Sequence, residues 1–175
     1  VVLTHEDCTP RIDFDSPVEC RCEIARQWNR FIELLGKPPT HLDAHHNIYR
    51  DERLTPLFVA WCEEKKVPLR EHSSVAYFSG FYGQWDGETH LEHIGVESLC
   101  GMLANRIGPG ITELGCHPGY IDPKFESSYA KERETELRTL CSPLVREAIN
   151  RLEVHLISYN EPDVFTPGEK ARSMP

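Results

Sequence analysis

Several features that would assign a protein to a class are missing from this 175-residue sequence. No apolar run approaches the roughly 20 residues that a membrane helix needs, so no membrane partner is expected. Residues 1–4 are apolar but follow no basic region, which argues against a signal peptide. Phosphate-binding glycine loops, Gly-x-Ser-x-Gly elbows and Walker patterns are absent as well, so the sequence carries none of these nucleotide-binding or serine-hydrolase signatures.

Positive charge is scarce, because 19 Lys and Arg residues face 28 Asp and Glu residues, for a formal net charge of −9. This balance argues against nucleic acid as a partner, since such proteins contact phosphates through basic surfaces. It fits a neutral or cationic small substrate, or no charged partner at all. The seven cysteines are odd in number and include no Cys-x-x-Cys pair, so neither a zinc ribbon nor a disulfide framework is indicated. Reduced cysteines in a cytoplasmic protein explain them.

Hydrophobic periodicity predicts strands that alternate with helices. Strands are expected at residues 1–4, 40–44, 67–70, 111–116 and 154–159. Helices are expected at residues 17–35, 55–66, 92–106, 129–140 and 142–152. At the start of the first helix, Ser16 can cap, Pro17 suits the first helical position and Glu19 completes a capping box, while Gly36 ends it. Residues 79–90, rich in glycine and aromatic side chains, are expected to form a loop.

The alternation of strands and helices indicates an α/β fold with parallel strands, because hairpin signals such as Asn-Gly do not appear between the expected strands. Residues 1–159 are expected to form one domain, followed by a polar, proline-containing tail at 160–175 that is expected to be mobile. In such folds functional groups gather at the carboxyl ends of strands. Two chemically rich tips, residues 41–46 and 116–120, follow predicted strands and could share one site.

The first tip combines three histidines with an aspartate. Spacings of i, i+4 on a helix or i, i+2 on a strand can aim two ligand groups at one point, as a catalytic divalent metal requires. His45 is the best candidate ligand and His41 a second one, while Asp43 could ligate or hold an imidazole in the right tautomer. The alternative is a polar loop in which these residues and His46 cap backbone groups.

The second tip offers a possible proton donor. His117 could act as a general acid toward a leaving amine or alkoxide, or could simply cap the loop. Glu113 could orient His117 or bind substrate, although a carboxylate on a strand can equally be solvated. Cys116 is a poor nucleophilic partner for His117, because neighbours on a strand point to opposite faces. The aromatic residues between positions 78 and 85, Tyr82 among them, could stack on sugars or pack the loop onto the core.

Two long motifs occur in order along the chain. Residues 30–46 read Arg-Phe-Ile-Glu-Leu-Leu-Gly-Lys-Pro-Pro-Thr-His-Leu-Asp-Ala-His-His, and residues 112–122 read Thr-Glu-Leu-Gly-Cys-His-Pro-Gly-Tyr-Ile-Asp. They resemble the central motif and the Glu-x-x-x-His-Pro-Gly-Tyr signature of the YdjC/ChbG-like carbohydrate deacetylases. The loop at 79–83 resembles a loop of the same family, and the resemblance extends from Val1 to about Tyr159.

The resemblance implies a TIM-barrel-like (β/α) deacetylase fold, incomplete at the N-terminus. It also implies hydrolysis of the acetamide of an N-acetylated sugar, such as a chitooligosaccharide or a related disaccharide, with Mg²⁺ or alternatively Zn²⁺. The family's metal is held by one Asp and two His, of which His45 matches one His, and His117 matches a candidate acid. A homodimer is compatible with the resemblance. The expected site comprises His117 and Asp43 as catalytic residues, His45 and His41 as metal ligands, and His46, Glu113, Tyr120 and Tyr82 as substrate contacts.

The chain departs from the family pattern at its start. The family's Asp-Asp-Phe-Gly motif has no counterpart here, and a second ligand histidine would precede Val1. Asn47 and Tyr49 stand where the family often has histidine. The leading hypothesis is therefore the C-terminal two-thirds of a metal-dependent sugar deacetylase, with weak or absent metal binding and catalysis by this chain alone. The alternatives are a non-catalytic carbohydrate-binding or scaffold derivative, and another metal hydrolase such as an amidase or a phosphoesterase.

Overall fold

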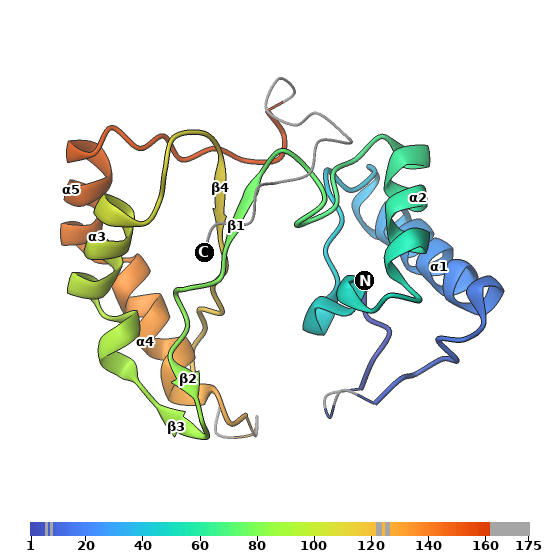
Figure 1. Cartoon of the computed structure of the whole chain (residues 1–175), viewed down its shortest axis with the longest axis horizontal. Coiled ribbons are helices and arrows are strands. Elements are labelled where there is room, and N and C mark those ends of the chain that lie inside the picture. Colours follow the sequence, from blue (N-terminus) through green and yellow to red (C-terminus); the bar gives the residue numbers. More distant parts are fainter. Residues whose placement is uncertain (6, 8, 122–123, 125–126, 162–175) are drawn as a thin grey trace. The chain divides into compact units, whose positions relative to one another are not determined.

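The computed structural model describes residues 1–5, 7, 9–121, 124 and 127–161 (Figure 1). These residues form two compact units. Unit 1 comprises Val1–Val75 with residues 158–161, and unit 2 comprises Ala76–Ile157. Each unit has its own cluster of buried hydrophobic side chains. The single domain expected at residues 1–159 stays a prediction, and the tail expected at 160–175 lies, from residue 162 on, outside the described residues.

Five α-helices in the described residues match the five predicted ones. They are α1 (Pro17–Leu35), α2 (Thr55–Lys65), α3 (Val96–Asn105), α4 (Ala130–Leu140) and α5 (Pro143–Arg151), with 3₁₀ helices η1 (His45–Arg50) and η2 (Leu91–Ile94). The helix expected at 92–106 is divided at Gly95, where extended backbone separates η2 from α3. None of the helices in the described part of the chain combines the length and the apolar character that crossing a bilayer requires.

The first helix begins and ends where the sequence predicts. The hydroxyl of Ser16 accepts a hydrogen bond from the backbone N–H of Glu19 at 3.4 Å. The backbone N–H of Ser16 donates to the carbonyl of Asp13 at 3.2 Å, so it is this carbonyl that takes the place of the Glu19 carboxylate expected in a capping box. Gly36 ends the helix with φ 68°, a left-handed conformation that glycine adopts without steric cost.

Short extended segments of unit 1 pair on both sides of residues 41–45. Leu42 and Leu69 form an isolated parallel bridge, and the N–H groups of Leu42 and Arg70 each donate across it. On the other edge, the Val1 nitrogen donates to the carbonyl of Asp43, and the N–H of His45 donates to the carbonyl of Val1. The expected strands at 40–44 and 67–70 therefore pair in parallel, but over one bridge rather than a full ladder.

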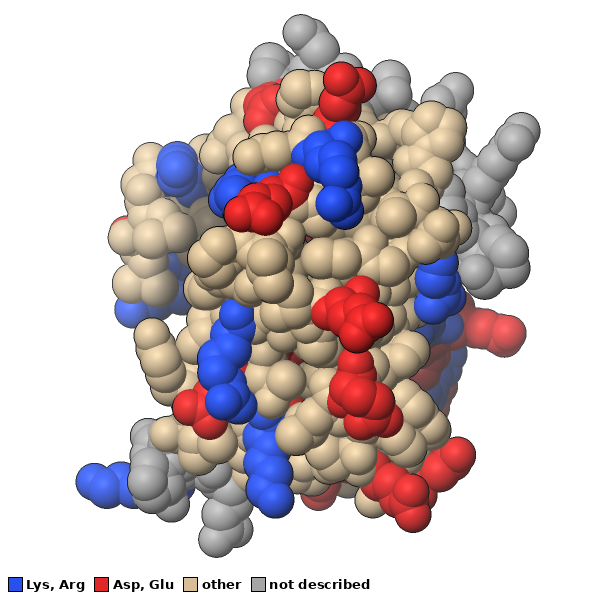
Figure 2. Space-filling model, turned by 90° about the vertical axis from the view of Figure 1, so that its left-hand side faces the viewer, with Lys and Arg blue, Asp and Glu red and all other residues tan. Residues whose placement is uncertain are grey.

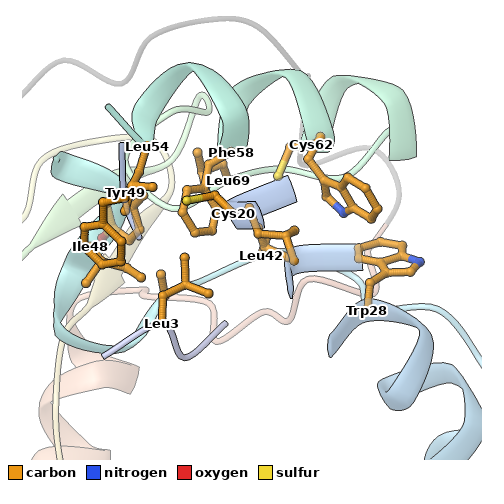
Figure 3. Close-up of a cluster of buried hydrophobic side chains, with 14 residues drawn as sticks. Leu3, Cys20, Trp28, Leu42, Ile48, Tyr49, Leu54, Phe58, Cys62 and Leu69 are labelled. Carbon is orange, nitrogen blue, oxygen red and sulfur yellow. The ribbon is translucent and has the colours of Figure 1, made fainter. Parts of the chain in front are cut away.

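The core of unit 1 gathers side chains from α1, α2, η1 and these extended segments (Figure 3). Tyr49, Leu54 and Phe58 are completely buried. Trp28 of α1 meets Trp61 of α2 edge to face, with ring centroids 6.1 Å apart. The buried members of this cluster are Leu3, Phe14, Cys20, Ile24, Trp28, Leu42, Ala44, Ile48, Tyr49, Leu54, Phe58, Trp61, Cys62 and Leu69.

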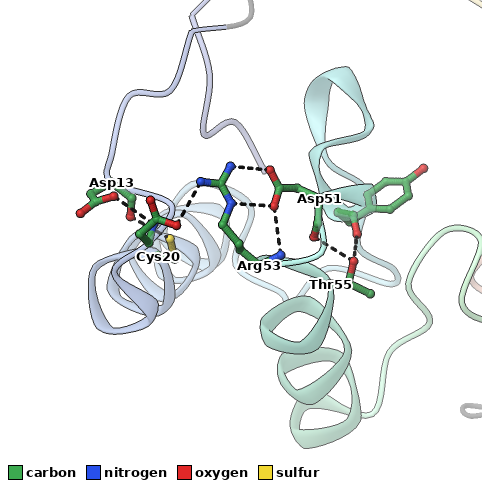
Figure 4. Close-up of polar contacts among 7 residues, drawn as sticks. Asp13, Cys20, Asp51, Arg53 and Thr55 are labelled. Atoms are coloured by element: carbon green, nitrogen blue, oxygen red, sulfur yellow. Dashed lines mark hydrogen bonds and ion pairs between the residues drawn. The ribbon is translucent and has the colours of Figure 1, made fainter.

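Side-chain contacts hold the turn that leads from η1 into α2 (Figure 4). The hydroxyl of Thr55 donates to the carbonyl of Tyr49 at 2.6 Å. The guanidinium of Arg53 lies 2.7 Å from the carboxylate of Asp51 and 3.1 Å from that of Asp15. These ion pairs are exposed, so each contributes at most about 1 kcal/mol, and they orient the turn more than they stabilise it.

Unit 2 contains a small parallel sheet. β1 (Ala76–Phe78) pairs with β4 (Thr112–Leu114), and Tyr77 lies opposite Glu113. The connection between the two strands carries α3, which is the crossover that a parallel pair requires. The chain is therefore a mixed α/β protein with parallel strand pairing, as the alternation predicts. On the face of the molecule drawn in Figure 2, acidic and basic side chains are interspersed.

The prediction of a loop at residues 79–90 is wrong in part. Residues 84–89 form an antiparallel hairpin of β2 (Gln84–Trp85) and β3 (Glu88–Thr89). Asp86 and Gly87 at its turn both have positive φ, 54° and 77°. A two-residue turn with positive φ at both positions favours Asp-Gly, so this dipeptide was a hairpin signal that the sequence analysis overlooked.

The closing strand expected at residues 154–159 is also wrong. These residues adopt neither helix nor strand. Leu156 and Ile157 are exposed. An apolar run becomes a strand only where a neighbouring strand accepts its hydrogen bonds, and no such pairing is recorded for these residues within the described part of the chain.

Phe58, the completely buried aromatic side chain of α2, offers a test of the unit 1 core. Phe58→Ala should lower the free energy of unfolding by about 3–5 kcal/mol, because it removes a completely buried ring and leaves a cavity. Leu34→Ala on α1 is the matched control, since Leu34 is 63% exposed and should change stability by less than about 0.5 kcal/mol. Urea unfolding followed by circular dichroism measures both, and equal losses would contradict the assignment of this core.

Candidate functional site

The residues expected to form one site divide between the two units. His41, Asp43, His45 and His46 belong to unit 1, and Tyr82, Glu113, His117 and Tyr120 belong to unit 2. Ring contacts join His45 to His46 in unit 1 and Tyr82 to His117 in unit 2. That the two sets share one site stays a prediction.

Alternation along the extended segment puts three of the expected residues on one face. Leu42 and Ala44 are buried in the core, whereas His41, Asp43 and His45 are partly or fully exposed. Alternate burial is the pattern of a strand. The i, i+2 spacing, and not the helical i, i+4 spacing, therefore puts these side chains on one face. The segment ends at His46, which with Asn47 takes a left-handed conformation, φ 56° and 52°.

The carboxylate of Asp43 is engaged on both oxygens. Its Oδ2 lies 2.6 Å from the guanidinium of Arg70, and its Oδ1 accepts the backbone N–H of Ala44 at 2.8 Å. Both side chains of the ion pair are partly buried, which strengthens their attraction relative to an exposed pair. With these partners Asp43 anchors the strand end, and a role as metal ligand would require it to exchange them.

The histidine rings of the first tip also have neighbours. His41 stacks on Tyr159 with ring centroids 3.9 Å apart, and its Nδ1 lies 3.0 Å from the hydroxyl of Thr40. The rings of His45 and His46 are 3.9 Å apart, and Nδ1 of His46 lies 2.9 Å from the hydroxyl of Thr4. Among residues 1–5, 7, 9–121, 124 and 127–161, no three His, Cys, Asp or Glu side chains are grouped so that they could hold a metal ion. The described donors therefore do not complete a metal site.

A cavity of about 290 Å³ lies beside the first tip within unit 1. Trp28, Phe31 and Leu42 supply apolar walls, and His41 and Asp43 stand among its polar lining residues. No sequence motif predicts this cavity. Helical periodicity places Trp28 on the core-facing side of α1. Only the packed structure shows that space remains between this helix and the extended segment.

The second tip joins an exposed histidine to two tyrosines. The rings of Tyr82 and Tyr129 are stacked with centroids 4.8 Å apart and planes within 8°. The ring of His117 lies edge-on to both, 5.6 Å from Tyr129 and 6.1 Å from Tyr82. Tyr82 is 39% exposed and Tyr120 is 86% exposed, so both can be reached by a ligand. The structure places the ring of Tyr82 beside that of His117, and the roles of both residues stay predictions.

Two buried carboxylates of α4 lie behind this tip, and the sequence analysis did not include them in the site. Glu132 and Glu136 are 1% and 0% exposed. Glu136 accepts the backbone N–H of His117 on one oxygen and the hydroxyl of Tyr129 on the other, the latter at 2.7 Å. Glu132 accepts the hydroxyl of Thr89 at 2.5 Å. Glu132 and Glu136 are four residues apart, so they share one face of α4, and this helix has no apolar stripe that would face the core instead. This pattern was the signal in the sequence from which a buried polar face could have been predicted.

Burial and hydrogen bonding keep Tyr129 neutral. Burial raises the pKa of the Tyr129 hydroxyl well above its ordinary value near 10, and its hydrogen bond to Glu136 raises it further. The neutral hydroxyl donates to Glu136 and accepts the backbone N–H of Gly83 at 2.9 Å. Tyr129 is thus a hydrogen-bonding link between α4 and the segment that carries Tyr82.

These features define a mixed α/β protein in which histidine-bearing tips follow extended segments that pair in parallel. The family model for YdjC-like protein matches residues 9–151. The chain therefore belongs to the YdjC-like protein family. A chitooligosaccharide deacetylase of Yersinia enterocolitica is 32% identical over 157 residues, which cover 79% of this chain and 59% of that protein. One of Yersinia pestis is 33% identical over 155 residues, which cover 78% and 58%.

A solved structure shares the fold. A protein of Enterococcus faecalis V583 assigned to cellobiose-phosphate cleavage superposes with a TM-score of 0.68 at 22% sequence identity. The match covers 84% of this chain and 61% of that one. The chain thus spans about three fifths of the length of the relatives and of the structure that it matches.

The raised pKa of Tyr129 predicts how stability responds to alkali. Above pH 10 the unfolded chain releases this proton while the folded chain keeps it, so stability is full below about pH 10 and is lost as pH rises toward the folded pKa. In this pH range a single buried tyrosine such as Tyr129 makes the free energy of unfolding fall by up to about 1.4 kcal/mol more per pH unit. Tyr129→Phe should flatten the dependence of urea stability on pH between 9.5 and about 11. An unchanged slope would contradict the buried, neutral state of Tyr129.

Proposed function

We propose that this protein is a hydrolase that removes the acetyl group from N-acetylated sugars of the chitooligosaccharide or N-acetyl disaccharide type. The observation that carries the proposal is the exposed imidazole of His117, held edge-on to a stacked tyrosine pair in a member of the YdjC-like family. The names of the Yersinia relatives support the same substrate class.

The residues of unit 2 suit the two tasks of such a reaction. One face of the Tyr82 ring is stacked on Tyr129, and the side chain remains partly exposed, so the ring can stack on the apolar face of a sugar. An amide leaves as an amine only when its nitrogen gains a proton, and His117 is the proposed donor. Glu113 and Tyr120 are proposed to contact the substrate.

The proposal includes a divalent metal, Mg²⁺ or alternatively Zn²⁺, with His45 and His41 as ligands and Asp43 as a catalytic group. Such an ion would supply an activated water and polarise the acetyl carbonyl. The donors in the described residues do not form a complete site, and Asp43 is occupied by Arg70, so no reaction step is assigned to the ion. His46 is a proposed substrate contact. We extend the proposal to a TIM-barrel-like fold, a cytoplasmic location and a homodimer.

A second candidate is a carbohydrate-binding protein without hydrolytic activity. The engagement of both oxygens of Asp43 favours it, because this carboxylate is then a structural anchor. The tyrosines of unit 2 could bind a sugar without any metal. The two candidates share a ligand class and differ in whether acetate is released.

Acetate release from di-N-acetylchitobiose in the presence of Mg²⁺ or Zn²⁺ tests the proposal. The assay uses the chain and a version extended at its N-terminus, since the chain alone is expected to bind metal weakly. In the active protein His117→Gln should lower kcat by about 10²–10⁴-fold, the usual contribution of a general acid. Tyr82→Ala should raise KM, because it removes a stacking contact rather than the proton donor.

His155→Gln is the control, since His155 is also an exposed histidine of unit 2 but lies outside the tip. Its kinetics should match those of the unaltered protein. Sugar binding without acetate release by either version would favour the carbohydrate-binding candidate. If neither version binds the disaccharide in a calorimetric titration, both candidates are wrong.

A further inference from the structure

We infer that Glu136 is a positioning residue, whose buried carboxylate holds the proton donor His117 and the sugar-stacking Tyr82 in one fixed arrangement. The roles of His117 as proton donor and of Tyr82 as sugar-stacking residue rest on the proposed function. The arrangement itself rests on contacts within unit 2, so the two can fail separately.

The carboxylate of Glu136 joins two segments of unit 2. It has no exposed surface, and an ionised carboxylate in such a place must be compensated by donors. The compensation comes from the N–H of His117, three residues after β4, and from the hydroxyl of Tyr129 just before α4. Hydrogen bonds to a charged acceptor are roughly twice as strong as those between neutral groups.

The constraint passes from Glu136 to Tyr82 through Tyr129. The oxygen of Tyr129 accepts the N–H of Gly83, the residue after Tyr82, and the two tyrosine rings stack. Gly83 is buried so tightly that an added Cβ would lie 2.7 Å from Cδ1 of Ile94. This close approach lets the backbone reach the Tyr129 hydroxyl. The stacking face of Tyr82 is therefore set by a carboxylate that does not touch it.

The backbone around His117 is tied to α4 at further points. The guanidinium of Arg133 lies 3.4 Å from the carbonyl of His117, and the N–H of Gly119 donates to the carbonyl of Arg133 at 3.1 Å. The histidine ring itself is exposed. A fixed backbone with an exposed ring limits the positions that the imidazole can take, as a general acid requires.

Glu132 provides a matched control on the same helix. It lies one turn before Glu136, is equally buried, and accepts a hydroxyl from Thr89 of β3. None of its recorded hydrogen bonds within the described residues goes to His117 or Tyr129. Removal of either carboxylate should weaken α4 packing, whereas only the loss of Glu136 should disturb the second tip.

The test compares the ¹⁵N-labelled full chain with Glu136→Gln and Glu132→Gln by NMR. Glutamine carries an NH₂ group in place of one carboxylate oxygen and has no charge, so it cannot accept at both positions where Glu136 does and its remaining hydrogen bond is not charge-assisted. In Glu136→Gln the amide proton of His117 should move upfield and exchange with solvent roughly ten- to a hundredfold faster, which corresponds to the loss of one charge-assisted hydrogen bond. The amide of Gly83 should shift with it. In Glu132→Gln these signals should stay in place while that of Thr89 moves.

Two results would overturn the inference. One is a His117 signal unchanged in Glu136→Gln, and the other is an equal change in Glu132→Gln, which would mean general loosening of α4. If Glu136→Gln does not fold, Tyr129→Phe decides, because it keeps the carboxylate while it removes the link to Gly83. Tyr129→Phe should shift the NMR signal of the Gly83 amide and leave the hydrogen exchange of the His117 amide slow. A Gly83 signal that stays in place would contradict the link from Glu136 through Tyr129 to Gly83.

Sugar binding then relates the arrangement to function. Glu136→Gln should weaken the binding of di-N-acetylchitobiose severalfold, and Glu132→Gln should leave it as in the unaltered chain. Equal weakening by both variants would contradict a positioning role. If the unaltered chain binds no disaccharide, the proposed function fails, while the NMR comparison still decides whether Glu136 positions His117 and Tyr82.

Discussion

The need to compensate one buried charge organises the second tip. Glu136 has no contact with solvent, so its two oxygens must be met by donors, which are the N–H of His117 beyond β4 and the hydroxyl of Tyr129 just before α4. Tyr129 then passes the restraint to Gly83. A carboxylate is suited to this position because it accepts on both oxygens and donates on neither. The exposed His117 and Tyr82 are held from beneath by a group that no ligand reaches.

The first tip is organised by a different constraint, the alternation of an extended segment. Leu42 and Ala44 face the core, so His41, Asp43 and His45 must share the other face. The carboxylate of Asp43 is compensated by Arg70, which comes from the segment that pairs with Leu42. In unit 1 the ion pair between Asp43 and Arg70 ties two adjoining segments together, as the hydrogen bonds of Glu136 tie two segments together in unit 2. Both tips thus combine exposed imidazoles with a carboxylate that anchors the backbone.

The sequence predicted the parts that depend on near neighbours along the chain. Helix periodicity and the Ser16 and Gly36 caps located α1, because both signals act within a few residues. The hairpin at Asp86 and Gly87 depends on an equally local signal, although residues 79–90 were expected to form a loop. The strand expected at 154–159 failed for a non-local reason, since its apolar pattern required a partner strand.

The sequence by itself determined the family, the α/β alternation and the identity of the histidines at both tips, because motifs and periodicity are properties of consecutive residues. Only the tertiary structure revealed Glu132 and Glu136 as buried, the stack of Tyr82 on Tyr129, and the pairing of Asp43 with Arg70. Each of these depends on which distant segments pack together. A glutamate on a helix has the same pattern whether it faces water or a buried tyrosine, and packing alone decides which.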